Sequence, residues 1–150
     1  MRRTMMTAEC VASGMCANTA AVRVSPEAGV PGIWMLDPLE TNRRYRAEGM
    51  ESFTDRFMRD GQADGYRPIT DTVEAARKWL GRGFGARCAF VATHDVFAAV
   101  LLRGFGAMQA SSAQWVGFLQ GCAFFERSGG GWDVEYIVPD KSDWVHAVIQ

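Results

Sequence analysis

The chain has 150 residues, of which 48% are hydrophobic and 22% are charged, a composition typical of one globular domain with its own core. The formal net charge of −1 gives the surface as a whole no attraction for nucleic acid or anionic membranes, and no apolar run reaches the length of a transmembrane helix. We therefore expect a single domain over residues 1–150 that binds neither nucleic acid nor membrane.

Helices and strands alternate along most of the predicted chain. In its first half we expect a helix over 4–17, a strand over 20–24, an irregular segment over 28–38, a helix from Thr41 or Asn42 to Asp60, and a helix that begins at a capping box over 71–74 and ends at Gly81. In its second half we expect a strand over 89–92, a helix with Asp95 as its N-cap, and two strands over 122–127 and 132–138 joined as a hairpin by residues 128–131.

Two features of the first half invite a functional interpretation that their context does not favour. The arginines Arg43, Arg44 and Arg46 belong to one predicted helix, and a solvated helix face is a better interpretation than a binding patch. The Gly-x-Gly-x-Gly sequence at 81–85 precedes a predicted strand, whereas phosphate-binding loops of this kind follow one. We interpret it as a helix stop, and expect Glu74 and Lys78 to pair across one helical turn.

The cysteines argue against disulfides and against a metal site. There are four of them, with no Cys-x-x-Cys pair and no histidine at metal-ligand spacing apart from the predicted strand that Cys88 shares with His94. Glu9 interrupts the first apolar stretch, which favours a helix over a signal peptide. We expect a reduced cytoplasmic protein with no cofactor and no bound metal.

The residues best placed for chemistry are His94 and Asp95. The short apolar run over 89–92 predicts a strand buried on both faces, and in open α/β sheets ligands bind at the carboxyl ends of such strands. The alternative is a structural histidine that caps the following helix or satisfies a buried partner.

The order of elements as a whole predicts an α/β sandwich with an antiparallel edge.

Two motifs together resemble the histidine phosphatase superfamily. Arg3-Thr4-Met5-Met6-Thr7-Ala8 is similar to the family's Arg-Thr-x-x-(Ser/Thr)-Ala helix start, and Phe90-Val91-Ala92-Thr93-His94-Asp95 is similar to the strand that ends in its second catalytic histidine. The apolar helix, the sequence at 115–121 and the closing hairpin continue the likeness. The resemblance implies a phosphoglycerate mutase-like fold, which is a three-layer α/β/α sandwich.

The resemblance also implies roles for three residues. Arg3 and His94 would bind the phosphoryl oxygens of a phosphorylated small molecule, and Asp95 would protonate the leaving group. These roles suit the chemistry, because a guanidinium and a protonated imidazole donate charge-assisted hydrogen bonds to phosphate and a carboxylic acid can supply a proton. The His-Asp pair points to the acid-phosphatase-like branch, although a mutase would use the same phosphate pocket.

One departure from the family pattern limits this interpretation. The family's nucleophile is a histidine in an Arg-His-Gly motif at the end of the first strand, and the chain contains neither this motif nor that strand. The other histidine of the chain, His146, is expected at a surface or edge. We expect a truncated or degenerate family member with little or no phosphatase activity. The alternative is a non-catalytic module on the same fold that binds phosphate or another protein. A missing central strand also predicts unpaired sheet edges and a homodimer formed through them.

Overall fold

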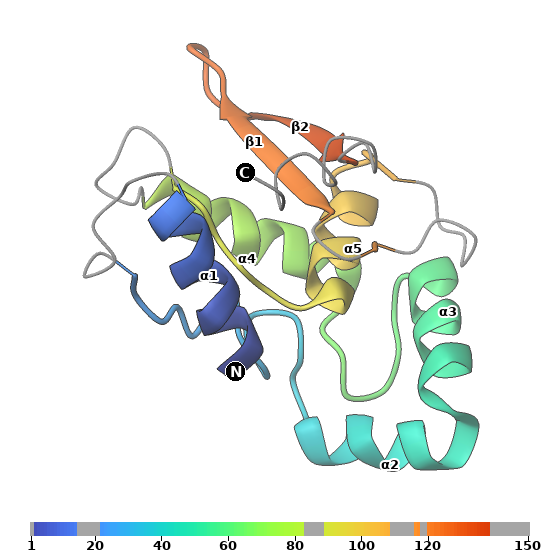
Figure 1. The fold of residues 1–150 in the computed structure, drawn as a ribbon. Helices are drawn as coiled ribbons and strands as arrows, with labels where there is room; N and C mark the ends of the chain where they lie inside the picture. The colour runs from blue at the N-terminus through green and yellow to red at the C-terminus, as the bar shows by residue number, and fades with distance from the viewer. Residues whose placement is uncertain (1, 15–21, 83–88, 109–115, 118–119, 139–150) are drawn as a thin grey trace.

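The computed structural model describes residues 2–14, 22–82, 89–108, 116–117 and 120–138. These residues form a mixed α/β fold of five helices and one two-stranded antiparallel sheet (Figure 1). The elements are α1 (Arg2–Gly14), α2 (Pro38–Glu48), α3 (Met50–Asp60), α4 (Ile69–Gly81), α5 (Asp95–Gly104), β1 (Gly121–Glu126) and β2 (Trp132–Ile137). No described helix is long and apolar enough to cross a bilayer.

Helix α5 lies at the centre of the core. Its residues 97–102 are all buried, which is the burial pattern of a helix that is apolar on every side. Helices α3 and α4 and both strands of the hairpin pack against it, and Figure 1 shows the hairpin lying over α5 with its turn projecting away from the helices. The predicted helix after residue 94 is therefore confirmed.

An aromatic cluster joins the irregular segment before α2 to the helices. Trp34 stacks on Phe97 of α5 with ring centroids 6.3 Å apart, and Tyr66 lies within 5.3 Å of the rings of Trp34, Phe53 and Phe57. The indole N–H of Trp34 donates to the carbonyl of Gly29 at 3.1 Å, which satisfies its one polar group. The segment over 28–38 is irregular up to the start of α2, as predicted, and it places Trp34 in the core.

The single helix predicted up to Asp60 is wrong, because Gly49 divides it into α2 and α3. Gly49 has a φ of 82°, which glycine adopts readily and other residues rarely do. Helix α2 also begins earlier than predicted. Its N-cap is Asp37, whose carboxylate accepts from the amides of Leu39 and Glu40 at 2.9 and 3.0 Å, whereas Thr41 lies inside the helix.

The capping box predicted at 71–74 is also wrong. Helix α4 begins at Ile69 without a side-chain cap, and the hydroxyl of buried Thr72 donates to the carbonyl of Arg67 at 3.3 Å. The predicted pair of Glu74 and Lys78 is present, with 2.6 Å between carboxylate and ammonium. The helix ends at Gly81 as expected, and the rest of the Gly-x-Gly-x-Gly sequence lies largely outside the described residues.

The buried strand predicted over 89–92 is wrong. These residues form no strand, and the side chains of Phe90 and Val91 are 56% and 37% exposed. A strand needs a neighbour to bond its backbone groups, and in the described residues the only two strands bond to each other in the hairpin. A three-layer sandwich around a parallel sheet is thus not found in the described part of the chain. Of the strand predicted over 20–24, residues 22–24 have no regular structure and the others are not described.

The hairpin and the first helix match their predictions. Strands β1 and β2 pair antiparallel with Gly121 opposite Ile137 and Glu126 opposite Trp132, within one residue of the expected bounds. Helix α1 covers the described part of the helix predicted over 4–17. No residue of α1 belongs to the hydrophobic core of the described chain, so α1 contributes little to its packing.

Candidate functional site

His94 lies at the start of α5 and is its N-cap. Its backbone is extended, with φ −85° and ψ 149°, and its carbonyl accepts from the amide of Ala98 at 3.1 Å. The imidazole is half-buried and makes no side-chain capping bond to the first turn. His94 therefore takes the capping position that the sequence assigned to its neighbour, but it holds that position through its backbone alone.

Asp95 is the first residue of α5 and not its N-cap. Its carboxylate accepts from the amide of the next residue, Val96, at 2.9 Å. The predicted position is wrong by one residue because the chain is already helical at Asp95, while an N-cap keeps extended backbone angles. Asp95 still places a negative charge in the first turn, where it interacts favourably with the helix dipole.

The segment leading to His94 is anchored to the irregular segment before α2. The hydroxyl of Thr93 donates to the carbonyl of Ala28 at 2.5 Å, joining residues 65 positions apart. Ala28 is itself buried in the core. His94 is thus held by a tertiary hydrogen bond on one side and by the start of a core helix on the other.

The structure also brings together two tyrosines that the sequence did not single out, one buried and one half-buried. Tyr45 of α2 and Tyr66, which precedes α4, share a hydrogen bond between their hydroxyls, and Thr54 lies within hydrogen-bonding reach of Tyr66. The pKa of Tyr66 is raised well above its ordinary value, mainly by burial, then by the bond with Tyr45, with a further contribution from the charge of Asp95. Tyr45 and Tyr66 are 21 positions apart, so only the folded chain shows this relationship.

Arg3 lies in the first turn of α1 with an exposed side chain. Its carbonyl accepts from the hydroxyl of Thr7 at 3.0 Å. In the described residues no hydrogen bond or ion pair joins Arg3 to His94, so the structure brings together His94 and Asp95 but supplies no contact between them and Arg3. His146 and the sequence over 109–115 lie outside the described residues.

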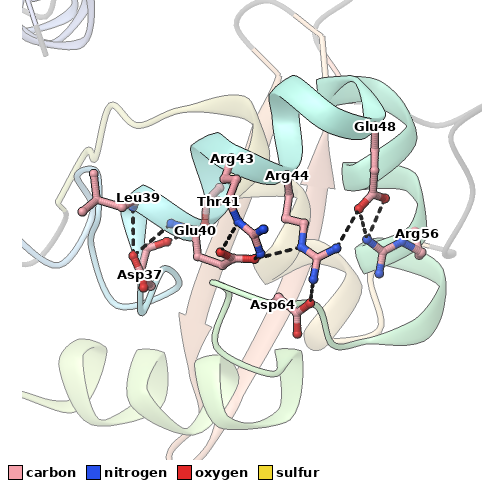
Figure 2. A network of polar contacts seen from close by, with 9 residues as sticks. All are labelled: Asp37, Leu39, Glu40, Thr41, Arg43, Arg44, Glu48, Arg56 and Asp64. Atoms are coloured by element: carbon pink, nitrogen blue, oxygen red, sulfur yellow. Dashed lines mark hydrogen bonds and ion pairs between the residues drawn. The ribbon is translucent and has the colours of Figure 1, made fainter.

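Two of the three arginines of α2, Arg43 and Arg44, belong to a network of ion pairs (Figure 2). Arg43 binds Glu40 through two hydrogen bonds of 2.7 Å, and Arg44 contacts Glu40, Glu48 and Asp64. Hydrogen bonds from Arg43 first, and from Arg44 next, lower the pKa of Glu40 to about 2. Arg43 and Arg44 are thus already neutralised by carboxylates. Arg43 and Arg46 are exposed and Arg44 is half-buried, which agrees with the predicted solvated face.

One concavity opens between the end of α3 and the start of α4. It has a volume of about 420 Å³ and is lined by Arg56, Asp60, Gln62, Ala63, Asp64, Tyr66 and Pro68. Its charged groups are already paired: Arg56 with Glu48, Asp64 with Arg44, and Asp60 with Arg59. The described residues also contain no group of three or more histidine, cysteine or acidic side chains that could hold a metal ion.

Comparison of the chain with family models, with curated proteins and with solved structures finds no match. His94 and Asp95, with the residues that hold them at the start of α5, are therefore the candidate site that the chain itself offers.

Proposed function

We propose that the protein binds phosphate or a phosphorylated small molecule at the start of α5, as a histidine-phosphatase-like protein that lacks the nucleophile of that family. The observation that carries the proposal is the position of His94. Its half-buried imidazole stands at a helix N-terminus and makes no capping bond to the first turn. Amides of a first helical turn have no partner inside the helix, and together with the helix dipole they attract anions.

The chemistry of the site favours binding over turnover. A protonated imidazole would donate to the phosphoryl oxygens, while the neighbouring carboxylate of Asp95 would oppose the anion. Hydrolysis through a phosphohistidine requires a second histidine beside the first, and the sequence holds no Arg-His-Gly motif to supply it.

Two further parts of the proposal come from the sequence alone. Arg3 is a second oxyanion donor only by its likeness to the family motif, and a three-layer sandwich would need a parallel sheet that the described residues do not contain. A cytoplasmic location agrees with the free thiols of Cys10 and Cys122, because thiols stay reduced there.

The experiment is a thermal-shift titration with inorganic phosphate and with tungstate. A ligand that binds only the folded chain raises the melting temperature with concentration. We expect this rise in the wild type and in His146→Ala, which removes the only other histidine, and its loss in His94→Ala and His94→Gln. His94→Gln keeps a hydrogen-bonding side chain of similar size without the charge, so it separates loss of binding from loss of folding. An equal shift in all variants, or none in the wild type, would refute the proposal.

Turnover is tested separately with a generic phosphomonoester. We expect the wild type to release no phosphate above background. Robust hydrolysis that disappears in His94→Ala would show that the chain contains a nucleophile we have not identified, and the binding-only part of the proposal would then be abandoned.

A further inference from the structure

In the part of the chain that the structure describes, the outer backbone edge of β1 pairs with no other strand. In an antiparallel pair, residues that exchange hydrogen bonds with the partner strand alternate with residues whose N–H and C=O point outward. Arg127 donates its amide to the carbonyl of Gly131 at 3.1 Å, so the backbone groups of Arg127 and of every second residue before it point toward β2. The backbone groups of Cys122 and Phe124 therefore point away from β2. No other described backbone group bonds to them.

The two edges of the hairpin differ in charge. Over residues 121–125 β1 has no charged side chain, whereas β2 carries Asp133 and Glu135. Charged residues on an edge strand discourage pairing with another sheet, and their absence permits it. The β1 edge is therefore the one suited to accept another strand.

The outward face of the hairpin supplies apolar surface next to that edge. Cys122 and Phe124 of β1 point toward α5 and pack on the core, while Phe125 on the opposite face is 51% exposed. Ile137 of β2, on the same outward face, is 44% exposed. A two-stranded sheet is only marginally stable by itself, and added strands stabilise it.

We propose that β1 pairs antiparallel with β1 of a second copy of this chain, about a two-fold axis at Ala123. The result is a continuous four-stranded sheet with the two β1 strands at its centre and the two β2 strands at its edges. Cys122 then exchanges hydrogen bonds with the partner subunit's Phe124. In this register Phe125 lies opposite the partner subunit's Gly121, where the missing side chain leaves room for the ring.

Charge favours a second copy joined through β1 over one joined through β2. Pairing two β2 strands would set Asp133 and Glu135 against the same acidic residues of the other copy, and like charges directly opposite are destabilising. Pairing two β1 strands opposes no charges over residues 121–125. A net charge of −1 per chain adds little repulsion at longer range.

The test compares two substitutions on the outward face of the hairpin. Ala123→Lys sets two ammonium groups opposite each other at the proposed axis, yet within one chain the new side chain faces Glu135 and can pair with it. Ile137→Lys is the matched control, because it adds the same charge to the same face on the outer strand. Sedimentation velocity over a concentration series measures the mass, and thermal melts verify that each variant is folded.

We expect the wild type and Ile137→Lys to sediment at twice the chain mass of 16.5 kDa, and Ala123→Lys to raise the dimer dissociation constant on the order of tenfold or more. The amides of Cys122 and Phe124 should exchange hydrogen slowly in the dimer and rapidly in folded, monomeric Ala123→Lys. A monomeric wild type would overturn the proposal, and slow exchange at those amides in such a monomer would show that the chain covers its own edge. Dimers lost in Ile137→Lys but kept in Ala123→Lys would assign the interface to β2 and also overturn it.

Discussion

Gly104 of α5 lies directly against Val73 of α4. A Cβ placed on Gly104 would overlap Cγ2 of Val73 and would lie 3.0 Å from Cγ2 of Ile69, closer than an ordinary van der Waals contact. The absence of a side chain at the last residue of α5 thus sets how closely α4 and the central helix approach each other. This contact joins the two helices that hold much of the core.

Gly104→Ala should therefore destabilise the protein by about 1–3 kcal/mol, because the added methyl group overpacks the helix contact. The matched control is Gly81→Ala at the last residue of α4, where a Cβ would meet nothing within 4 Å. There the same substitution should stabilise by about 0.4–1 kcal/mol, since it lowers the entropy of the unfolded chain. Urea unfolding of both variants measures the difference. Equal effects of the two substitutions would mean that the helices can separate without cost.

Tyr66 should make the protein sensitive to alkaline pH. Its folded-state pKa is raised above the ordinary value of 10.0, chiefly by burial, so folding favours the neutral phenol. Stabilisation by the buried neutral phenol is therefore complete below pH 10.0 and is lost as the pH rises further, because the unfolded chain then ionises first. The free energy of unfolding should fall more steeply above that pH in the wild type than in Tyr66→Phe.

At neutral pH Tyr66→Phe should lower the free energy of unfolding by about 1 kcal/mol, because it removes the hydroxyl that bonds Tyr45. Tyr136→Phe is the control, since its hydroxyl is only half-buried and bonds Gln120. Parallel stability profiles for wild type and Tyr66→Phe above pH 10.0 would contradict the buried, neutral phenol.

The elements that the sequence predicts well are those with a local cause. The αL glycine Gly61, with φ 77°, ends α3 where the apolar pattern stops, and the glycine-rich turn before β2 joins two alternating strands. Helix α5 is recognised by its run of apolar residues. Each of these signals is complete within a few neighbouring residues, so no tertiary contact is needed to read it.

The failed predictions depend on contacts that sequence spacing does not carry. The apolar run over 89–92 suits a strand, but no described strand lies beside it to pair with, and the next residue, Thr93, bonds through its hydroxyl to the carbonyl of Ala28. Thr41 suits an N-cap, but its hydroxyl donates to the carbonyl of Asp37 inside the first turn at 2.9 Å. For the candidate site, the sequence placed His94 and Asp95 at a helix start and could not show the hydrogen bond from the preceding residue, Thr93, to Ala28.

Arg44 should stabilise the arrangement of α2, α3 and the loop before α4. Its guanidinium contacts Glu40 and Glu48 within α2 and Asp64 beyond α3, while Glu48 also binds Arg56 (Figure 2). Arg44→Ala should lower the melting temperature, by less than the overpacking of Gly104 does, and added salt should shrink the effect by screening the charges.

Arg43→Ala is the matched control for Arg44, because Arg43 is 70% exposed and contacts only Glu40 on its own helix. Arg43→Ala should change the melting temperature less than Arg44→Ala does at every salt concentration, since exposed ion pairs within one helix contribute little to stability. Two variants with the same melting temperature would show that the link from α2 to Asp64 adds no stability.

Cys122 should be an unreactive thiol despite lying on the hairpin. Burial raises its pKa to about 11 from an ordinary 9.0, which leaves on the order of a hundredfold less thiolate at neutral pH. Cys10 on α1 is exposed, so a reagent reaches it more easily than it reaches Cys122. Chain variants that keep only one cysteine, with serine at the other three positions, should react with a thiol reagent quickly at Cys10 and slowly at Cys122. In denaturant the two rates should converge, because unfolding removes the burial that protects Cys122; comparable rates in the folded proteins would mean that the inner face of the hairpin opens to solvent.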